Sequence, residues 1–246
     1  MRGVETAYIL DLVNFHAVDF SGLATGEGCL KGLFGELQAS GELTVEQFKF
    51  QDGRMGTLHA NVDWNKEKEQ IDIRAIADDG PDAKTYINGF VAPGPGPGFI
   101  DLDIRADGTY LDFAQSFTSS FISHIDAHSS GAVRLIGPLD AINLTGELIL
   151  NGRAHVKPLG CTYEMRNDTL RMVPNEIIFA NCPVYDIHGN EGIMTGGIHH
   201  QELTNLTYDI YVTADRLLAY DFPDFGSEIF YGTAFVQGNA AIHGRN

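Results

Sequence analysis

The sequence predicts an all-β protein, a long and mostly antiparallel sheet with one apolar face. Apolar and polar residues alternate through the 246-residue chain, and a period of two places the apolar ones on one face of a strand. Turn signals such as Gln51-Asp52-Gly53, Asp107-Gly108 and His188-Gly189-Asn190 separate these runs. Such short connections join antiparallel neighbours, because a parallel crossover needs about a dozen residues or more.

The segment from Ser130 to Leu150 shows the pattern most clearly, as two strands broken by a turn at Gly137-Pro138. Its alternating apolar residues are Val133, Leu135, Ile142, Leu144, Leu148 and Leu150. Other runs show the same alternation, with Leu58, Ala60, Val62 and Trp64; Ile71, Ile73, Ala75 and Ala77; Ile100, Leu102, Ile104 and Ala106; Leu206, Tyr208, Ile210, Val212 and Ala214; and Ala234, Val236, Ala240 and Ile242. The pattern leaves open whether this face is a sealed core or an open trough.

Two segments depart from the strand pattern. Between Tyr110 and Ile125, Phe113, Phe117 and Phe121 recur every four residues, which predicts one short amphipathic helix that covers or plugs part of the sheet. The run 93–98 alternates proline with glycine, and proline cannot donate to a ladder of hydrogen bonds. This run is therefore expected to form a loop between two strands.

Composition excludes several classes of protein. The formal net charge of −17 argues against a nucleic-acid partner, because such partners are polyanions. Three cysteines without paired metal spacing, Cys29, Cys161 and Cys182, indicate neither a disulfide framework nor a zinc site. No signal peptide and no apolar run long enough to span a membrane is present. The strand-like pattern at the last residues suggests a fragment of a longer protein.

One short motif could begin a metal site. His124 and His128 lie four residues apart around Asp126, a spacing that brings two ligands together on a helix. The sequence indicates no third ligand, and the solvated end of the predicted helix is the preferred interpretation. His199 and His200 are adjacent, so a strand would point them to opposite faces. No catalytic constellation is found, and the sequence predicts a non-enzymatic protein without a cofactor.

A series of short motifs in the second half of the chain carries a family resemblance. It runs through 130–139, 144–148, Cys161-Thr162-Tyr163, 168–170, 185–192, 196–200, 208–212 and 230–234. In this order and spacing, these motifs resemble the C-terminal region of the TamB family of AsmA-like envelope proteins of Gram-negative bacteria. The resemblance covers about residue 72 to the end and is weaker before that.

The resemblance implies a sheet curled lengthwise into a groove. It divides the chain into a first groove segment (1–109), a short helix (110–128) and a second groove segment (129–246) that is truncated at its end. It also implies a periplasmic protein of the cell envelope, with an inner-membrane anchor outside this chain. The implied function is shielding of phospholipid acyl chains during transport to the outer membrane.

Under this interpretation the apolar face would hold lipid. The expected groove residues are Leu58, Val62, Ile71, Ile73, Ile100, Leu102, Ile104, Val133, Leu135, Ile142, Leu144, Leu148, Leu150, Ile210, Val212 and Val236. Two alternatives stay open. The same residues could form the closed core of a β-sandwich. The chain could also be an assembly scaffold for outer-membrane proteins, acting by strand addition with a β-barrel partner of the BamA/TamA type.

Overall fold

The chain folds into one antiparallel sheet in which each strand pairs with its neighbours in sequence. The computed structural model describes residues 4–5, 20–31, 38–94, 96–201, 204–223 and 231–245. Strand order follows chain order from β1 to β14, and every neighbouring pair is antiparallel. The predicted fold class is confirmed. Because the described strands all belong to one sheet, they do not form a two-sheet sandwich.

Most of the strands are long, and most of their connections are short. They are β1 (Val4–Glu5), β2 (Phe20–Lys31), β3 (Gln38–Phe50), β4 (Gly53–Asn65), β5 (Gln70–Asp78), β6 (Lys84–Ala92), β7 (Phe99–Tyr110), β8 (Ile122–Pro138), β9 (Asn143–Val156), β10 (Cys161–Val173), β11 (Glu176–Asp186), β12 (Glu191–Gln201), β13 (Thr204–Phe222) and β14 (Gly232–Arg245). The predicted turn at Gly137-Pro138 ends β8, and the predicted loop 93–98 joins β6 to β7. Within that loop, Pro95 lies outside the described residues.

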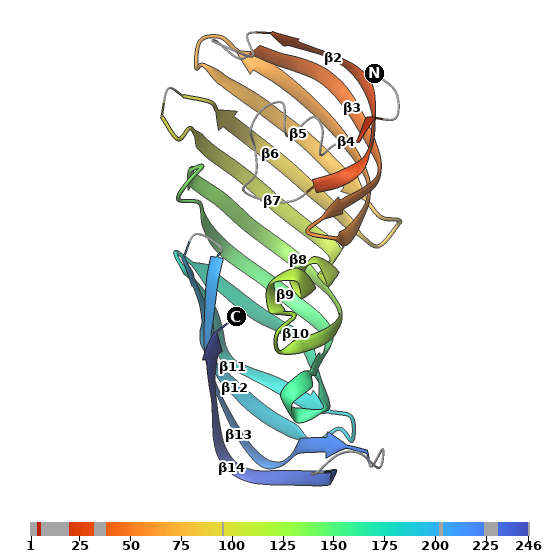
Figure 1. Ribbon diagram of the computed structural model, residues 1–246, viewed down its shortest axis with the longest axis vertical. Helices are drawn as coiled ribbons and strands as arrows, with labels where there is room; N and C mark the ends of the chain where they lie inside the picture. The colour runs from red at the N-terminus through yellow and green to blue at the C-terminus, as the bar shows by residue number, and fades with distance from the viewer. Residues whose placement is uncertain are drawn as a thin grey trace.

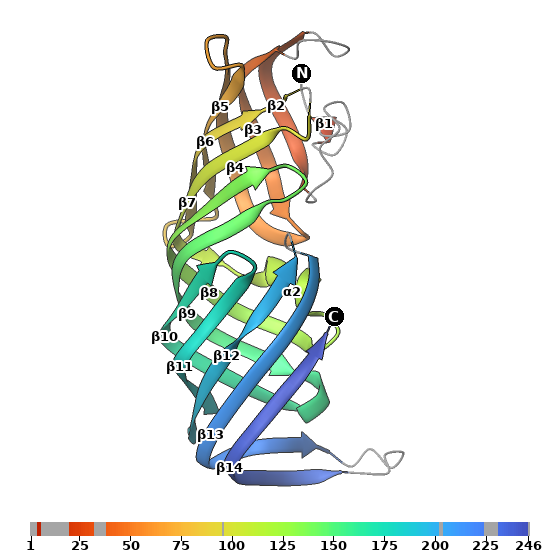
Figure 2. The same cartoon turned by 90° about the vertical axis from the view of Figure 1, so that its left-hand side faces the viewer.

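The sheet curls about the long axis of the molecule. In Figure 1 the strands are stacked along this axis and are inclined to it, and the sheet is curved rather than flat. Figure 2 shows the same curl from the side, with β13 and β14 at the lower end. In the part of the chain that the structure describes, the helical turns are η1 (Asp112–Ala114), α2 (Gln115–Thr118) and η2 (Lys157–Leu159), and they occupy connections between strands. The curl gives the sheet an inner and an outer face.

The helical segment is shorter than the sequence predicts. A helix was expected over 110–125 and a helical segment over 110–128, but helical structure ends at Thr118 and β8 begins at Ile122. The residues from Ile122 to His128 pair with β9, whose strand is long enough to satisfy their backbone groups. In the sequence, the alternation of Ile125 and Ala127 with polar neighbours indicates this strand. The flanking segments 1–109 and 129–246 contribute to one sheet through the β7–β8 pair.

Glycines on the inner face allow neighbouring strands to approach closely. Gly89 has a φ of +148° and Gly146 a φ of +131°, a region that side chains disfavour. A Cβ at Gly89 would overlap the carbonyl oxygen of Asp101 on β7, and one at Gly146 would overlap that of Ala132 on β8. Glycine at these positions is therefore compatible with a strongly coiled sheet.

A compact apolar cluster lies at the N-terminal end of the sheet. It comprises Ala24, Val45, Phe48, Met55 and Ala77, with Phe20, Phe50, Leu58 and Phe113 packed against it. Four of these residues form a chain of ring contacts, with centroids 5.8 Å apart for Phe20–Phe48, 5.4 Å for Phe20–Phe50 and 5.2 Å for Phe50–Phe113. The cluster anchors one end of the groove.

The burial of His200 predicts a pH dependence of folding. The predicted separation of the two adjacent histidines is confirmed, since His200 is 4% exposed and His199 Nε2 lies 3.4 Å from the Asp209 carboxylate on the outer face. Burial, followed by the charge of His199, lowers the pKa of His200 below its ordinary value of 6.5. Folding thus favours neutral imidazole, so this contribution to stability is present above about pH 6.5 and is lost as pH falls toward the lowered pKa.

We therefore expect a specific part of the acid sensitivity to disappear in His200→Gln. The urea midpoint of the wild-type protein should fall between pH 7 and pH 5, and it should fall less in this variant. His124→Gln, at an exposed position of β8, is the control and should keep the wild-type pH dependence. An unchanged pH dependence in His200→Gln would contradict the prediction.

Candidate functional site: a continuous apolar groove

A continuous apolar row runs along the inner face. Strand register places one residue from each strand from β3 to β14 side by side, and every member is apolar, glycine or tyrosine. The row is Leu43, Ala60, Ala75, Ile87, Ile104, Val133, Gly146, Met172, Ile177, Ile198, Tyr208 and Gly244. With about 4.8 Å between strands, its eleven steps cover about 53 Å. We call this the central row.

On each strand, a residue adjacent to the central-row member faces outward. These residues also align from strand to strand, and their row is mostly polar. It is Thr44, His59, Ile76, Tyr86, Arg105, Ala132, Glu147, Arg171, Ile178, Gly197, Asp209 and His243. Ion pairs join strands on this face, such as Arg134–Asp101 at 2.7 Å and Arg153–Asp126 at 2.9 Å. These pairs are exposed and contribute little stability each. The two faces therefore differ in chemistry along most of the sheet.

Fifteen of the sixteen groove residues expected from the sequence share the inner face, because the register of their strands aligns them with the central row or its neighbours. The remaining residue, Ile142, lies just before β9 and has no partner in the register. Ile100 and Ile142 are buried, with exposed fractions of 2% and 7%, and all the others are half-buried. A sealed core would bury such side chains almost completely. The inner face of β4–β9, which we call the open section, is thus an apolar surface in partial contact with solvent.

Sequence reasoning missed several inner-face residues. Ile87, Met172, Ile177 and Ile198 belong to the central row but were not among the expected groove residues. Ile87 lies in a run where alternation was visible, with Thr85 before it and Val91 after it. Gly89 interrupts that run and weakens its signal. Met172 and Ile177 flank a tight turn, and their alternating runs are short.

The helical turns lie along one margin of the groove, at the right in Figure 1. Phe113 of η1 contacts Phe50, the backbone N–H of Arg54 donates to the Asp112 carboxylate at 3.1 Å, and Ser116 Oγ donates to the Gln51 carbonyl at 2.6 Å. The connection between β7 and β8 therefore packs against the β3–β4 hairpin, far away in sequence. These contacts fix the β7–β8 connection along this margin of the groove.

The C-terminal part of the sheet curls so far that β13 meets strands across the groove. Tyr163 Oη on β10 donates to the carbonyl of Leu218 on β13 at 2.6 Å, although three strand spacings would separate them by about 14 Å in a flat sheet. Bulges after Ala214 and Leu218 bend β13 here. Leu218 is fully buried. We call the inner face of β10–β13 the covered section.

Asp186 binds the backbone N–H of Leu218, whereas Tyr163 binds its carbonyl. Its carboxylate is 4% exposed and accepts from Leu218 N at 2.8 Å, His188 N at 2.9 Å, Asn190 N at 2.9 Å and Asn190 Nδ2 at 2.8 Å. Burial alone would raise its pKa, but the hydrogen bonds from Asn190, Leu218 and His188 outweigh burial and lower it. Asp186 is therefore a charged carboxylate whose hydrogen bonds all come from groups within the chain. We call the hydrogen bonds that Asp186 and Tyr163 make to Leu218 the Leu218 clasp.

Tyr163 completes this clasp from β10. Burial, followed by the neighbouring Cys161, raises the pKa of Tyr163, so its hydroxyl stays protonated and donates to Leu218. The side chains of Tyr163 and Asp186 thus bind the carbonyl and the N–H of the same residue. No short-range sequence signal could have identified this arrangement, because 55 and 32 residues separate the partners.

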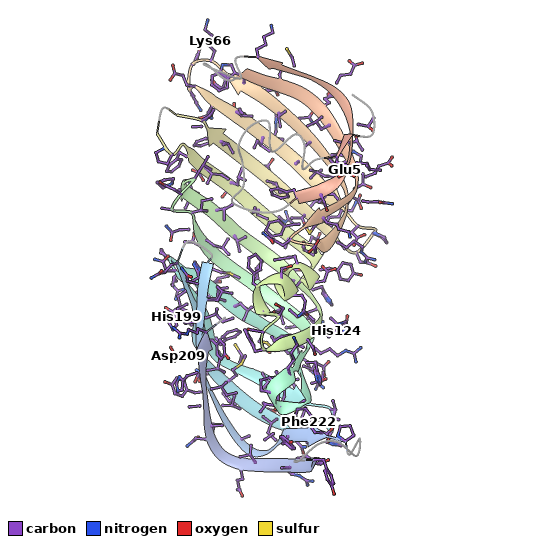
Figure 3. The ribbon with its side chains drawn as sticks, viewed as in Figure 1. Glu5, Lys66, His124, His199, Asp209 and Phe222 are labelled. Carbon is purple, nitrogen blue, oxygen red and sulfur yellow. The ribbon has the colours of Figure 1, made fainter. Side chains whose placement is uncertain are left out.

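The histidine motif does not form a metal site. His124 and His128 lie on one strand, where four residues span about 13 Å, and not at the end of a helix as expected. Figure 3 places His124 on the opposite side of the molecule from His199 and Asp209. Among the residues that the structure describes, no group of three or more His, Cys, Asp or Glu is arranged to hold a metal ion.

The three cysteines form no disulfide, and two of them are buried on the inner face of the sheet. Cys29 is exposed, whereas Cys161 and Cys182 are buried with exposed fractions of 1% and 2%. Burial raises the pKa of both buried thiols. Register with Val156 and Met194 places these two cysteines on the inner face of β10 and β11.

Comparison with known proteins identifies no relative. No family model, no curated protein and no solved structure matches the chain. Within the described ranges, no helix is both long and apolar enough to cross a membrane.

Proposed function

We propose that this chain shields phospholipid acyl chains in its inner groove during transport. One observation carries the proposal, namely the uninterrupted central row with half-buried aliphatic side chains on both sides of it. An enzyme pocket or a sealed core would not need an apolar surface extended over about 53 Å. One leaflet of a bilayer core is about 15 Å thick, so the row is longer than a single lipid.

The energetics favour such a surface for lipid movement. Exposing about 30 methylenes of a phospholipid to water costs on the order of 24 kcal/mol, at about 0.8 kcal/mol each. An apolar groove removes much of this cost. Apolar contact is also non-directional, so a chain can slide past successive residues without breaking hydrogen bonds. In the open section, most charged side chains lie on the outer face and so would not contact a chain that moves along the inner face.

The sequence motifs also support a cellular location for this function. Resemblance to the AsmA-like envelope proteins supports a periplasmic protein that delivers phospholipid toward the outer membrane, with an inner-membrane anchor outside this chain. An outer-membrane β-barrel protein of the BamA/TamA type is the expected protein partner. No cofactor is needed for this function, because no bond is made or broken.

Native mass spectrometry of the gently purified chain tests the proposal. We expect phospholipid to remain bound after purification from cells that supply it. Delipidated protein should also take up a fluorescent phosphatidylethanolamine. If neither bound lipid nor uptake is observed for the folded protein, the proposed function is wrong.

One observation favours the second function, an assembly scaffold that adds a client strand. In the described sheet β14 pairs only with β13, and its sequence contains no acidic residue and no proline. Charges and prolines normally protect an edge from pairing. Photocrosslinking from exposed positions of β14, such as Gln237, separates the two functions, since protein adducts favour a scaffold and lipid adducts favour a groove.

A further inference from the structure

Two aromatic side chains meet across the curl of the sheet. Phe121 lies just before β8, and Tyr208 belongs to the central row on β13. Their ring centroids are 4.6 Å apart with an interplanar angle of 39°. Five strand spacings separate β8 from β13, or about 24 Å in a flat sheet. The ring pair therefore bridges the groove where the open section meets the covered section.

Each ring is held by its own support. The backbone of Phe121 is fixed on both sides, since its N–H donates to the Thr118 carbonyl at 3.0 Å and its carbonyl accepts from Lys157 N at 2.9 Å. Tyr208 pairs with Gly244 on β14, and a Cβ at Gly244 would overlap the Tyr208 hydroxyl. The φ of Gly244 is not positive, so alanine there would displace the ring without straining the backbone.

The region beyond the ring pair is the more enclosed part of the groove. Leu170, Met172, Cys182 and Val184 are buried there, whereas the large aliphatic members of the central row in the open section, Ile87, Ile104 and Val133, are half-buried. The Leu218 clasp closes the far end. A ligand in the open section therefore meets the ring pair before it reaches the buried apolar residues of β10 and β11.

We propose that Phe121 and Tyr208 form an aromatic gate that controls entry of acyl chains into the covered section. The acyl-chain ligand rests on the proposed function, but the gate is a property of the fold and can be tested without lipid. Ring contact keeps the gate closed, and separation of the rings admits the chain. Tyr208 supplies one ring of the gate, and Gly244 positions that ring.

The buried thiols provide the test. N-Ethylmaleimide labelling of the full chain, followed residue by residue with mass spectrometry, should modify Cys29 quickly and Cys161 and Cys182 slowly. In Tyr208→Ala we expect labelling of Cys182 to accelerate about twofold to tenfold, the range that loss of one aromatic pair predicts. Gly244→Ala should act in the same direction, because it displaces the ring without removing it.

Tyr211→Ala is the matched control. Tyr211 lies on the same strand, is 49% exposed on the outer face and contacts His243. Its loss should leave the labelling of Cys182 unchanged. Urea unfolding of each variant shows whether labelling follows global stability. Equal labelling rates in wild type, Tyr208→Ala and Gly244→Ala would overturn the gate, as would acceleration that follows the loss of stability alone.

Lipid uptake separates the gate from the proposed function. Uptake of fluorescent phosphatidylethanolamine should be faster in Tyr208→Ala than in wild type and unchanged in Tyr211→Ala. Faster thiol labelling with no lipid uptake in any variant would retain a gate in the fold and overturn both lipid shielding and the acyl chain as ligand. Lipid uptake at one common rate, with unchanged labelling, would retain lipid shielding and overturn the gate.

Discussion

Asp186→Ala should destabilise the folded chain by about 2–4 kcal/mol, more than a typical surface substitution. The variant leaves the N–H groups of Leu218, His188 and Asn190 without their charged acceptor, and at least the first is buried. An unsatisfied buried donor costs about 1–3 kcal/mol. Urea unfolding monitored by circular dichroism measures the loss.

The matched comparison for this prediction is Asp103→Ala. Asp103 is an exposed carboxylate on the outer face of β7, and its removal should change the free energy of unfolding by about 0.5 kcal/mol or less. Asp186→Asn should fall between the two, because the amide keeps one acceptor oxygen and places a donor against donors. Equal stability of Asp186→Ala and Asp103→Ala would show that the clasp does not hold β13.

Val133→Asp should weaken lipid binding about tenfold or more. Val133 is a half-buried member of the central row, between Ile104 and Gly146. Burying a valine side chain against an apolar ligand contributes about 1.5 kcal/mol or more, and about 1.4 kcal/mol corresponds to tenfold in affinity. A carboxylate at this position would also have to lose water when lipid binds. Titration with fluorescent phosphatidylethanolamine measures the affinity.

Ala132→Asp controls for the introduced charge. Ala132 is the preceding residue on β8 and is exposed on the outer face, so its substitution should leave lipid affinity unchanged. Val133→Ser tests the site if the aspartate variant fails to fold, and it should weaken binding in the same direction. Equal affinity for the inner-face and outer-face variants would rule out the groove as the lipid site.

The sequence predicted the architecture well where one local pattern dominates. Alternation placed Val133, Leu135 and Leu144 on a common face, and the structure confirms their alignment through the β8–β9 register. The helix prediction was wrong in extent, because the phenylalanines spaced every four residues favour a helix whereas the alternation around Ile125 favours a strand. Pairing with β9 decides the structure of that segment.

The sequence could not predict the curl or the contacts that close it. Tyr163, Asp186 and Leu218 come from three strands, and each looks ordinary in its own run. The Phe121–Tyr208 contact likewise joins residues 87 positions apart. Such contacts depend on the accumulated coiling and bulging of many strands, which local patterns do not encode separately.

By itself, the sequence determined an antiparallel sheet with one apolar and one polar face, because side chains alternate across a strand with a fixed period of two. Only the tertiary structure decided that the apolar face is a half-exposed groove and not a sealed core. That outcome depends on whether a second layer covers the face. Within the described residues, the sheet curls upon itself, leaving the inner face of β4–β9 half-exposed and closing over β10–β13 through Leu218.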